Sequence, residues 1–147
     1  MEKAIMIDID GTLANIDHRK CFIEQRPKNF KDFLDPLNIS KDKVNLWCSA
    51  IIEKFYGDYK IVLCSGRTED CRGETEKWLW VNGIVYDHLF MRASLDYRKD
   101  FEVKKEIFEN KIRDVFQVLF VVDDRQQVVD MWRKLGLVCL QCDYGDF

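Results

Sequence analysis

Five short runs of apolar and β-branched residues predict five β-strands, because each run is too short for a typical helix and is bounded by charged or turn-forming residues. Residues 118–122 are continuously apolar, which is typical of a strand that is covered on both faces of a sheet. We expect the strands at residues 3–9, 60–65, 84–91, 117–122 and 137–142.

The segments between these strands carry apolar residues at helical spacing and predict four helices. Ser40 is a candidate cap for the first helix, and the face predicted to be buried contains Val44, Trp47, Ile51 and Phe55. This pattern places Trp47 in the core. The other helices are expected over residues 74–81, from a cap at Asp100, and over residues 126–135.

Strands that alternate with helices predict a doubly wound α/β domain with a central parallel sheet and right-handed crossovers. Residues 14–39 interrupt this alternation and contain both prolines of the chain. We expect this segment to be a small insertion after the first strand. Because ligands bind at the carboxyl ends of the strands in such sheets, the insertion would overhang the functional edge.

A length of 147 residues fits one domain, and 47% apolar with 33% charged residues is typical of a globular protein. The net charge of −3 predicts no generally basic surface, so any nucleic-acid-binding site must be a local patch. No export signal and no membrane-length apolar run occur, so the six cysteines are expected as free thiols in a reducing cytoplasm. Cys139 and Cys142 would point to opposite faces of a strand, which disfavours a shared metal or a disulfide.

Polar side chains follow three of the predicted strands at their carboxyl ends. They are Asp8 and Asp10 where the first strand ends, Ser65 and Gly66 where the second ends, and Asp123 and Asp124 where the fourth ends. A helix cap explains a single carboxylate at such a position, but several at matching strand ends would repel one another and raise each other's pKa. A divalent cation resolves the repulsion, and Mg²⁺ prefers carboxylate and phosphate oxygens.

These residues resemble the haloacid dehalogenase-like phosphohydrolases, whose first motif is similar to Asp8-Ile9-Asp10-Gly11-Thr12. Within that family the chain is most similar to the 3′-phosphatase domains of bacteriophage polynucleotide kinase/phosphatases, from Lys3 to the last residue. The likeness is carried by the first motif and by residues 65–67, 98–100, 103–108, 123–125, 128–133 and 145–147. It implies a three-layer Rossmann-like fold with a central parallel sheet.

The resemblance implies a covalent mechanism in which two carboxylates have different roles. Asp8 would attack phosphorus and form an aspartyl-phosphate, and Asp10 would protonate the leaving sugar oxygen and then activate the hydrolytic water. Asp10 needs a raised pKa to act as an acid near neutral pH, and we expect Asp8 and the substrate phosphate to raise it. Mg²⁺ would be held by Asp8, the main-chain oxygen of Asp10 and a carboxylate of the fourth motif, for which we favour Asp124 over Asp123.

The same resemblance implies further substrate contacts. Ser65 and the Gly66 N–H would hold phosphate oxygens, and Lys104, with Lys105 as the competing position, would neutralise charge on Asp8 and the phosphoryl group. The remaining candidates are Arg19 on the insertion, Arg67 after the Ser-Gly turn, Arg92 and Arg98 along a nucleic-acid backbone, Asp100, which could also simply cap its helix, and the base-stacking aromatics Phe22, Phe30 and Phe33.

We therefore predict a Mg²⁺-dependent polynucleotide 3′-phosphatase that acts on DNA or RNA ends, with 2′,3′-cyclic phosphates as a further substrate that the resemblance implies. The alternatives are a nucleotidase for free mononucleotides and a non-catalytic nucleic-acid-binding module, although the intact Asp8, Asp10 and Lys104 argue against the latter. No GxxxxGK[ST] phosphate-binding loop occurs, so a kinase domain is expected to be absent and a separate polynucleotide kinase or ligase to be the partner. We expect no membrane contact, and a cytoplasmic location, in the host if the chain is viral.

Overall fold

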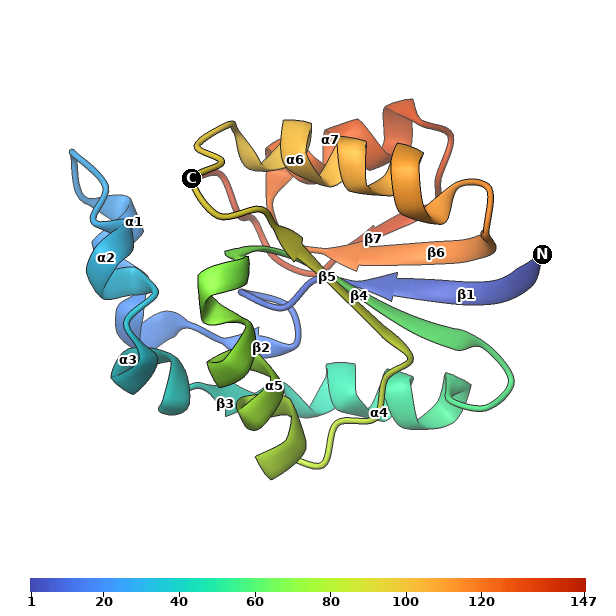
Figure 1. The fold of residues 1–147 in the computed structure, drawn as a ribbon, viewed down its shortest axis with the longest axis horizontal. Coiled ribbons are helices and arrows are strands. Elements are labelled where there is room, and N and C mark those ends of the chain that lie inside the picture. Colours follow the sequence, from blue (N-terminus) through green and yellow to red (C-terminus); the bar gives the residue numbers. More distant parts are fainter.

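The computed structural model describes residues 1–147 and contains a five-stranded sheet with the strand order β5-β4-β1-β6-β7 (Figure 1). Every neighbouring pair of strands is parallel. The chain passes from the central strand β1 to one side of the sheet and later returns to its other side at β6, so ligands are expected where the carboxyl ends of β1 and β6 meet. The strands are β1 Glu2–Ile7, β4 Lys60–Thr68, β5 His88–Arg92, β6 Phe116–Asp123 and β7 Cys139–Gln141.

Helices cover both faces of this sheet and complete a three-layer α/β fold (Figure 1). α4 (Leu46–Phe55) and α5 (Arg72–Val81) lie on one face, and α6 (Asp100–Ile107) and α7 (Gln126–Lys134) lie on the other. Alternate residues of β1 explain this arrangement, since Ile5 and Ile7 belong to one buried cluster while Ala4 and Met6 belong to the other. The predicted α/β class with a central parallel sheet is confirmed.

Short elements fill the segment between β1 and α4, which projects beside the carboxyl ends of the strands (Figure 1). The antiparallel pair β2–β3 closes this segment at its base. The expected insertion at residues 14–39 therefore extends to Val44, where the pairing ends. Its elements are β2 Ala14–Asn15, the 3-10 helix Asp17–Arg19, α1 Cys21–Glu24, α2 Phe30–Phe33, α3 Pro36–Ser40 and β3 Lys43–Val44.

The prediction for the first helix is wrong in its start and for Trp47, whereas Val44, Ile51 and Phe55 pack against the core as expected. Ser40 ends α3 instead of capping α4, whose N-cap position is Asn45. Because α4 begins later than expected, Cys48 and Ile52 face the core while Trp47 is 44% exposed.

Other boundaries differ by a few residues. β5 begins at His88 instead of residue 84, because Asp87 lies before it and its carboxylate accepts a hydrogen bond from the Ile61 N–H at 2.8 Å. α6 has Lys99 at its N-cap position, so Asp100 lies in the first turn of the helix and its side chain does not cap it. That carboxylate is therefore available for contacts at the strand ends.

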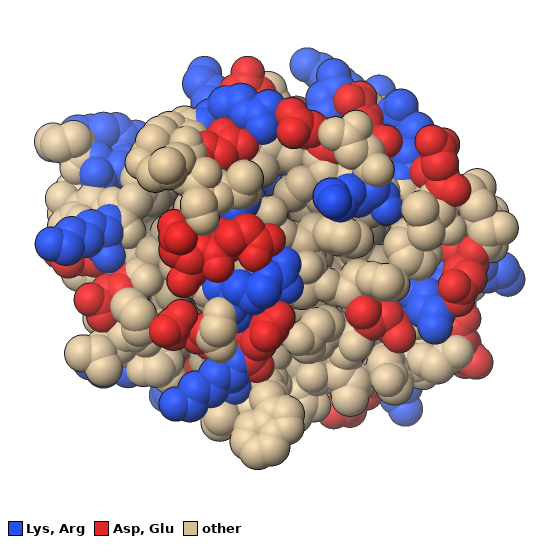
Figure 2. Space-filling model, viewed as in Figure 1, with Lys and Arg blue, Asp and Glu red and all other residues tan.

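The surface carries charges of both signs. On the face shown in Figure 2, lysines and arginines are interspersed with aspartates and glutamates, and no extended basic surface appears. No helix of the structure combines the length and the apolar character needed to cross a membrane.

Candidate active site

Three buried carboxylates gather where the carboxyl ends of β1 and β6 meet. Asp8 follows β1, Asp123 ends β6 and Asp124 comes next in the chain. One oxygen from each of the three side chains lies within 4.8 Å of those of the other two. This set of hard oxygen donors is suited to a divalent cation such as Mg²⁺.

Lys104 reaches this cluster from α6. Its Nζ donates hydrogen bonds to Asp8 Oδ1 at 2.8 Å and to Asp123 Oδ2 at 3.1 Å, and it lies 3.6 Å from Asp100 Oδ2. The side chain of Lys104 is buried, whereas Lys105 is exposed. Of the two candidate lysines, the structure thus brings Lys104 to the carboxylates.

The loop after β1 brings its backbone and a hydroxyl group against the same carboxylates. Thr12 is fully buried, and its Oγ1 lies 3.1 Å from Asp8 Oδ2 and 3.4 Å from Asp124 Oδ1. Gly11 has a φ of +84°, and a Cβ added there would stand 2.2 Å from Asp124 Oδ2. Only glycine therefore allows this close approach of the loop to Asp124.

The concentration of negative charge changes the acidity of these groups. Burial, reinforced by the nearby Asp123 carboxylate, raises the pKa of Asp8 well above its ordinary value even though Lys104 opposes the shift. The same two causes, burial first, raise the pKa of Asp124 to about 6. The single positive charge of Lys104 thus does not neutralise the three carboxylates. A bound divalent cation would reduce their mutual repulsion.

Asp10 is held separately from this cluster by two arginines. Arg19 Nη2 donates to Asp10 Oδ1 at 2.6 Å, and Arg67 Nε lies 3.1 Å from both carboxylate oxygens of Asp10. Burial alone would raise the pKa of Asp10, but Arg67 and Arg19 outweigh burial and hold this pKa well below its usual range. The expectation that Asp8 raises this pKa is therefore wrong, because the two arginines determine it.

Asp42 is a residue of this site that sequence reasoning missed. Its buried carboxylate accepts hydrogen bonds from Arg19 Nε at 2.9 Å and Arg19 Nη2 at 2.6 Å, and lies 3.4 Å from Arg67 Nη2. His18 Nε2 contacts it at 2.7 Å. Asp42 stands between two lysines in the sequence, as is typical of charged residues on the surface. Nothing in the neighbouring sequence therefore predicts that it is buried.

Arg19 and Arg67 are both enclosed by the protein. Both side chains are fully buried, and Arg19 Nη1 also donates to the Phe33 carbonyl at 2.9 Å. The Cζ atom of Arg19 lies over the Phe33 ring, 4.4 Å from its centre. Because Asp42 and the Phe33 carbonyl fix the Arg19 guanidinium, its contact with Asp10 orients that carboxylate.

Residues 65–67 lie within β4, where its pairing with β5 is irregular, and they approach α6 closely. Ser65 is buried, and its Oγ accepts a hydrogen bond from the Arg67 N–H at 3.1 Å. A Cβ at Gly66 would stand 2.1 Å from Asp100 Oδ1, and the Gly66 carbonyl accepts from Arg92 Nε at 2.9 Å. Gly66 thus lies between the site and the helix that carries Lys104.

Arg92 and Arg98 line the cleft, but their N–H groups already donate to other groups of the protein. Arg92 donates to the carbonyls of Asp96 and Arg98, and its Nη2 lies 3.4 Å from Asp100 Oδ1. Arg98 pairs with Asp96 at 2.7 Å and with Glu106 at 2.6 Å. These contacts fold the loop between β5 and α6 against the site.

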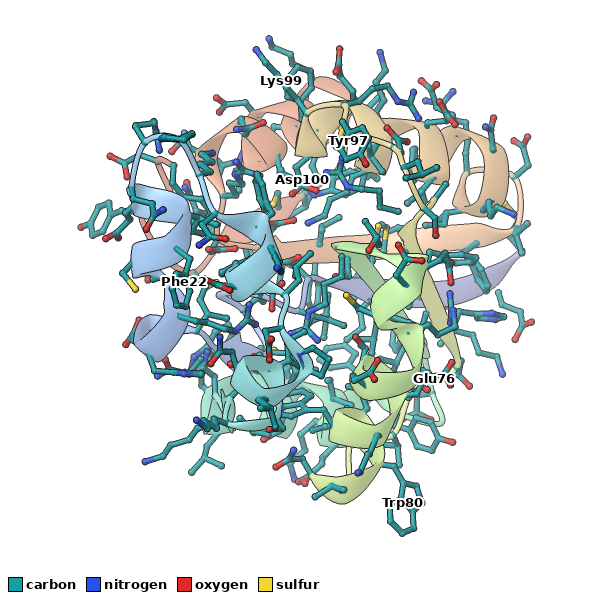
Figure 3. All side chains as sticks on the ribbon, turned by 60° about the vertical axis from the view of Figure 1, so that its left-hand side comes forward. Phe22, Glu76, Trp80, Tyr97, Lys99 and Asp100 are labelled. Atoms are coloured by element: carbon teal, nitrogen blue, oxygen red, sulfur yellow. The ribbon has the colours of Figure 1, made fainter.

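A cleft of about 610 Å³ opens from Asp8 and Asp10 toward the solvent. Its walls come from the insertion on one side and from the β5–α6 loop and α6 on the other; Figure 3 labels Tyr97 and Asp100 on the latter side. Of the three aromatics predicted to stack on a base, Phe30 and Phe33 line the cleft and Phe22 does not. Phe33 is buried, which leaves Phe30 as the exposed one.

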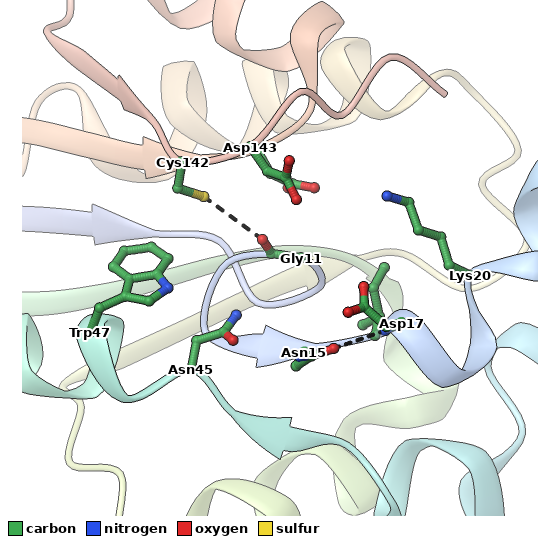
Figure 4. Close-up of a pocket in the computed structure, with 10 residues that line it drawn as sticks. Gly11, Asn15, Asp17, Lys20, Asn45, Trp47, Cys142 and Asp143 are labelled. Atoms are coloured by element: carbon green, nitrogen blue, oxygen red, sulfur yellow. Dashed lines mark hydrogen bonds between the residues drawn. The ribbon is translucent and has the colours of Figure 1, made fainter.

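A smaller pocket of about 150 Å³ adjoins Gly11 and Asp124 (Figure 4). Trp47 and Asn45 line it, and so does Cys142, whose thiol lies 3.7 Å from the Gly11 carbonyl. Cys139 instead belongs to the buried cluster that β1 shares with α7. The two cysteines thus occupy different environments, and all six cysteines of the chain are free thiols.

The parallel sheet with these carboxylates and a buried lysine at its carboxyl edge defines a haloacid dehalogenase-like hydrolase. A haloacid dehalogenase-like family hydrolase from Streptococcus pneumoniae has a TM-score of 0.69 with this structure, covering 95% of this chain and 84% of that one. Because the sequence identity is 12%, this likeness concerns the fold.

The model of the polynucleotide kinase PNKP phosphatase domain matches residues 2–147, and the chain belongs to this family of phosphatases. A putative bifunctional polynucleotide kinase/RNA ligase of Autographa californica nuclear polyhedrosis virus is 32% identical over 138 residues, which are 92% of this chain and 18% of that protein. A chain in the structure of a Pnkp1/Rnl/Hen1 complex is 38% identical with a TM-score of 0.84, covering 100% of this chain and 48% of that one. The chain thus spans less than half the length of these relatives.

Proposed function

We propose that this phosphatase domain removes the 3′-phosphate from nucleic-acid ends with the help of Mg²⁺. The observation that carries the proposal is the position of Asp8, which is buried with Lys104 and two further carboxylates at the base of the cleft, while Asp10 is held apart by arginines. Two carboxylates in such different surroundings are suited to two different roles in one reaction.

The residues present fit a bound Mg²⁺ ion. Asp8, Asp124 and the main-chain oxygen of Asp10 would hold it, since the Asp123 oxygens already accept hydrogen bonds from Lys104, Trp132 Nε1 and the Arg125 N–H. Asp124 Oδ1, by contrast, has a long contact of 3.4 Å with Thr12 Oγ1. When bound, the ion would neutralise the carboxylates and polarise the phosphoryl group.

The chain's own groups then account for the two steps. A carboxylate oxygen of Asp8 attacks phosphorus, the bond from phosphorus to the sugar oxygen breaks, and a proton passes from Asp10 to that oxygen. In the second step Asp10 takes a proton from a water molecule, which attacks the aspartyl-phosphate and releases inorganic phosphate and free Asp8. Lys104 holds Asp8 in place and offsets its charge.

Because Arg67 and Arg19 hold the pKa of Asp10 low, its carboxylate is ionised, which suits its role as the base of the second step. The acid role in the first step requires a proton, and the negative charge of the bound phosphate supplies the opposing influence that raises the pKa of Asp10. An acid is needed because a sugar alkoxide is a poor leaving group.

The family membership and the names of the relatives support a polynucleotide as the substrate. We propose further that the domain works with a polynucleotide kinase or ligase activity, which the named relatives carry or accompany. This activity would reside in a separate polypeptide or in another part of a longer one. Removal of the 3′-phosphate would then precede the joining of the ends.

Release of inorganic phosphate from a 3′-phosphorylated oligonucleotide, with Mg²⁺ and with chelator, tests the proposal. We expect turnover only with Mg²⁺, and none for Asp8→Asn, which removes the nucleophile and little volume. Thermal unfolding and circular dichroism check that Asp8→Asn remains folded. Turnover by Asp8→Asn near the wild-type rate would refute the covalent mechanism, and activity on 3′-mononucleotides alone would point to a nucleotidase.

A further inference from the structure

The cleft is larger than removal of a phosphate requires. Its volume of about 610 Å³ is in the range of pockets that enclose ligands much larger than orthophosphate. The reacting carboxylates lie at its base, and the outer part is lined by aromatic and basic side chains that the proposed reaction does not use.

Two exposed aromatic side chains stand on different walls of this outer part. Phe30 begins α2 on the insertion and is 52% exposed, and Tyr97 on the β5–α6 loop is 87% exposed. Figure 3 shows Tyr97 above the cleft, on the side of α6. Exposed aromatic rings on a cleft wall are suited to stacking on nucleobases, and such stacking tolerates any sequence.

A cation without a carboxylate partner lies beside Phe30. No carboxylate is within ion-pair distance of Lys28, whose ammonium group stands 6.0 Å from the centre of the Phe30 ring. Burial and the nearby guanidinium groups of Arg125 and Arg26 lower the pKa of Lys28, while Asp100 opposes them. Lys28 and Arg125 both line the cleft, so positive charges from the insertion and from the sheet edge face the same space.

Arg125 is partly compensated, because its Nη1 lies 3.6 Å from Asp100 Oδ2 and its Nε donates to the Phe147 carbonyl at 2.8 Å. An anion beside Lys28 would relieve the remaining repulsion between the two cations. A phosphodiester of a nucleic-acid strand is such an anion, and the bases on either side of it would reach the aromatic rings. Arg92 is engaged by carbonyls of the β5–α6 loop and Arg98 by Asp96 and Glu106, whereas Lys28 has no carboxylate partner, so we assign the contact to Lys28.

We propose that Lys28, Phe30 and Tyr97 form a polymer subsite that binds the nucleotides preceding the 3′ end of a single strand. Lys28 contacts the phosphodiester and the two rings stack on bases. This inference rests on the proposed function, since it assigns the strand that leads into the reacting site. It makes the domain prefer oligonucleotides to mononucleotides.

Steady-state kinetics of three substrates test the subsite, namely a 3′-phosphorylated oligonucleotide, a 3′-mononucleotide and p-nitrophenyl phosphate. For Phe30→Ala/Tyr97→Ala we expect the oligonucleotide KM to rise by roughly 10-fold or more, from the loss of base stacking. For Lys28→Ala we expect the slope of log KM against log salt concentration to fall by about 0.7, which is the value for one phosphate contact to a single strand. Turnover of the two small substrates should stay unchanged.

Matched controls come from the same surface. Lys31 is exposed on α2 and does not line the cleft, and Tyr144 is 90% exposed and lies outside it. Lys31→Ala and Tyr144→Ala should leave oligonucleotide kinetics as in wild type. Equal effects of the subsite and control variants, or equal effects on oligonucleotide and mononucleotide, would overturn the subsite.

A binding measurement separates failure of the subsite from failure of the proposed function. Fluorescence anisotropy with a labelled oligonucleotide that ends in a 3′-hydroxyl requires no turnover. Weaker binding by Lys28→Ala and by the double variant supports the subsite even if the wild type releases no phosphate from 3′ ends. Undiminished binding by both variants rejects the subsite even if the wild type is an active 3′-phosphatase.

Discussion

Replacing Asp42 by alanine should destabilise the fold strongly, because its carboxylate is the buried partner of Arg19. The Arg19 Nη2–Asp42 Oδ2 distance is 2.6 Å, and both side chains have 0% exposure. The substitution leaves Arg19 and Arg67 in the interior with only Asp10 to balance them. An uncompensated charge in the interior cannot regain the hydration that it has in the unfolded chain.

The expected magnitude follows from the burial of this pair. Removing one partner of a buried ion pair costs about 3–5 kcal/mol. That is a large part of the roughly 5–15 kcal/mol by which a domain is stable. At about 2–4 °C for each kcal/mol in a chain of this size, the thermal midpoint should fall by roughly 6–20 °C.

A second ion pair of the protein provides the control. Arg98 Nη1 and Glu106 Oε2 are also 2.6 Å apart, but their side chains are 46% and 53% exposed. Glu106→Ala should leave the midpoint nearly unchanged, because water and salt screen an exposed pair. Differential scanning calorimetry or urea unfolding of both variants provides the measurement. If Asp42→Ala loses no more stability than Glu106→Ala, the reasoning from burial is wrong.

Three further outcomes are expected. Gly11→Ala should weaken Mg²⁺ binding, because the added Cβ would stand 2.2 Å from Asp124 Oδ2; calorimetric titration measures the affinity. Gly57 has a similar φ of +97° with open space around it, so Gly57→Ala should keep the affinity. Asp10→Asn should slow turnover of sugar phosphates by about 10²–10⁴-fold. Turnover of p-nitrophenyl phosphate should fall much less, since the nitrophenolate leaving group needs no acid. Equal losses on both substrates would reject Asp10 as the acid. Burial raises the pKa of Asp124 from its ordinary 3.8 to about 6. Between these two pH values the folded protein without metal keeps a proton on Asp124 that the unfolded chain releases. The free energy of unfolding should therefore fall as the pH rises from about 4 to about 6. Urea unfolding of wild type and Asp124→Asn over that range checks the sign, and identical pH slopes would contradict it.

The order and type of the main elements could be predicted from the sequence, because they depend on patterns within short segments. The continuously apolar run 118–122 indicates β6, and β1 carries apolar residues that enter buried clusters on both faces of the sheet. The cluster of Asp8, Asp123 and Asp124 could also be predicted, since carboxyl ends of parallel strands meet at one edge.

The ends of the elements and the orientation of Trp47 on α4 were harder to predict from the sequence. Residue 44 was expected within the helix that Ser40 caps, but it pairs with Ala14 in the small sheet β2–β3. This pairing delays the helix and turns Cys48, instead of Trp47, toward the core. A strand pair between segments 30 residues apart has no signature in either segment alone.

The electrostatics of Asp10 show where reasoning from the sequence stops. Its nearest carboxylate in the chain, Asp8, predicts a raised pKa, whereas the arginines that hold it lower that pKa. Arg67 lies 57 residues away in the chain, and Asp42, which aligns Arg19, looks like a solvated residue between two lysines. Local patterns of apolar residues are enough to specify strands and helices, because burial of one face is a property of a short segment. The protonation state and partners of a buried charge depend on which distant segments the fold packs around it. For Asp10, only the three-dimensional arrangement of the insertion, the end of β4 and the loop after β1 decided them.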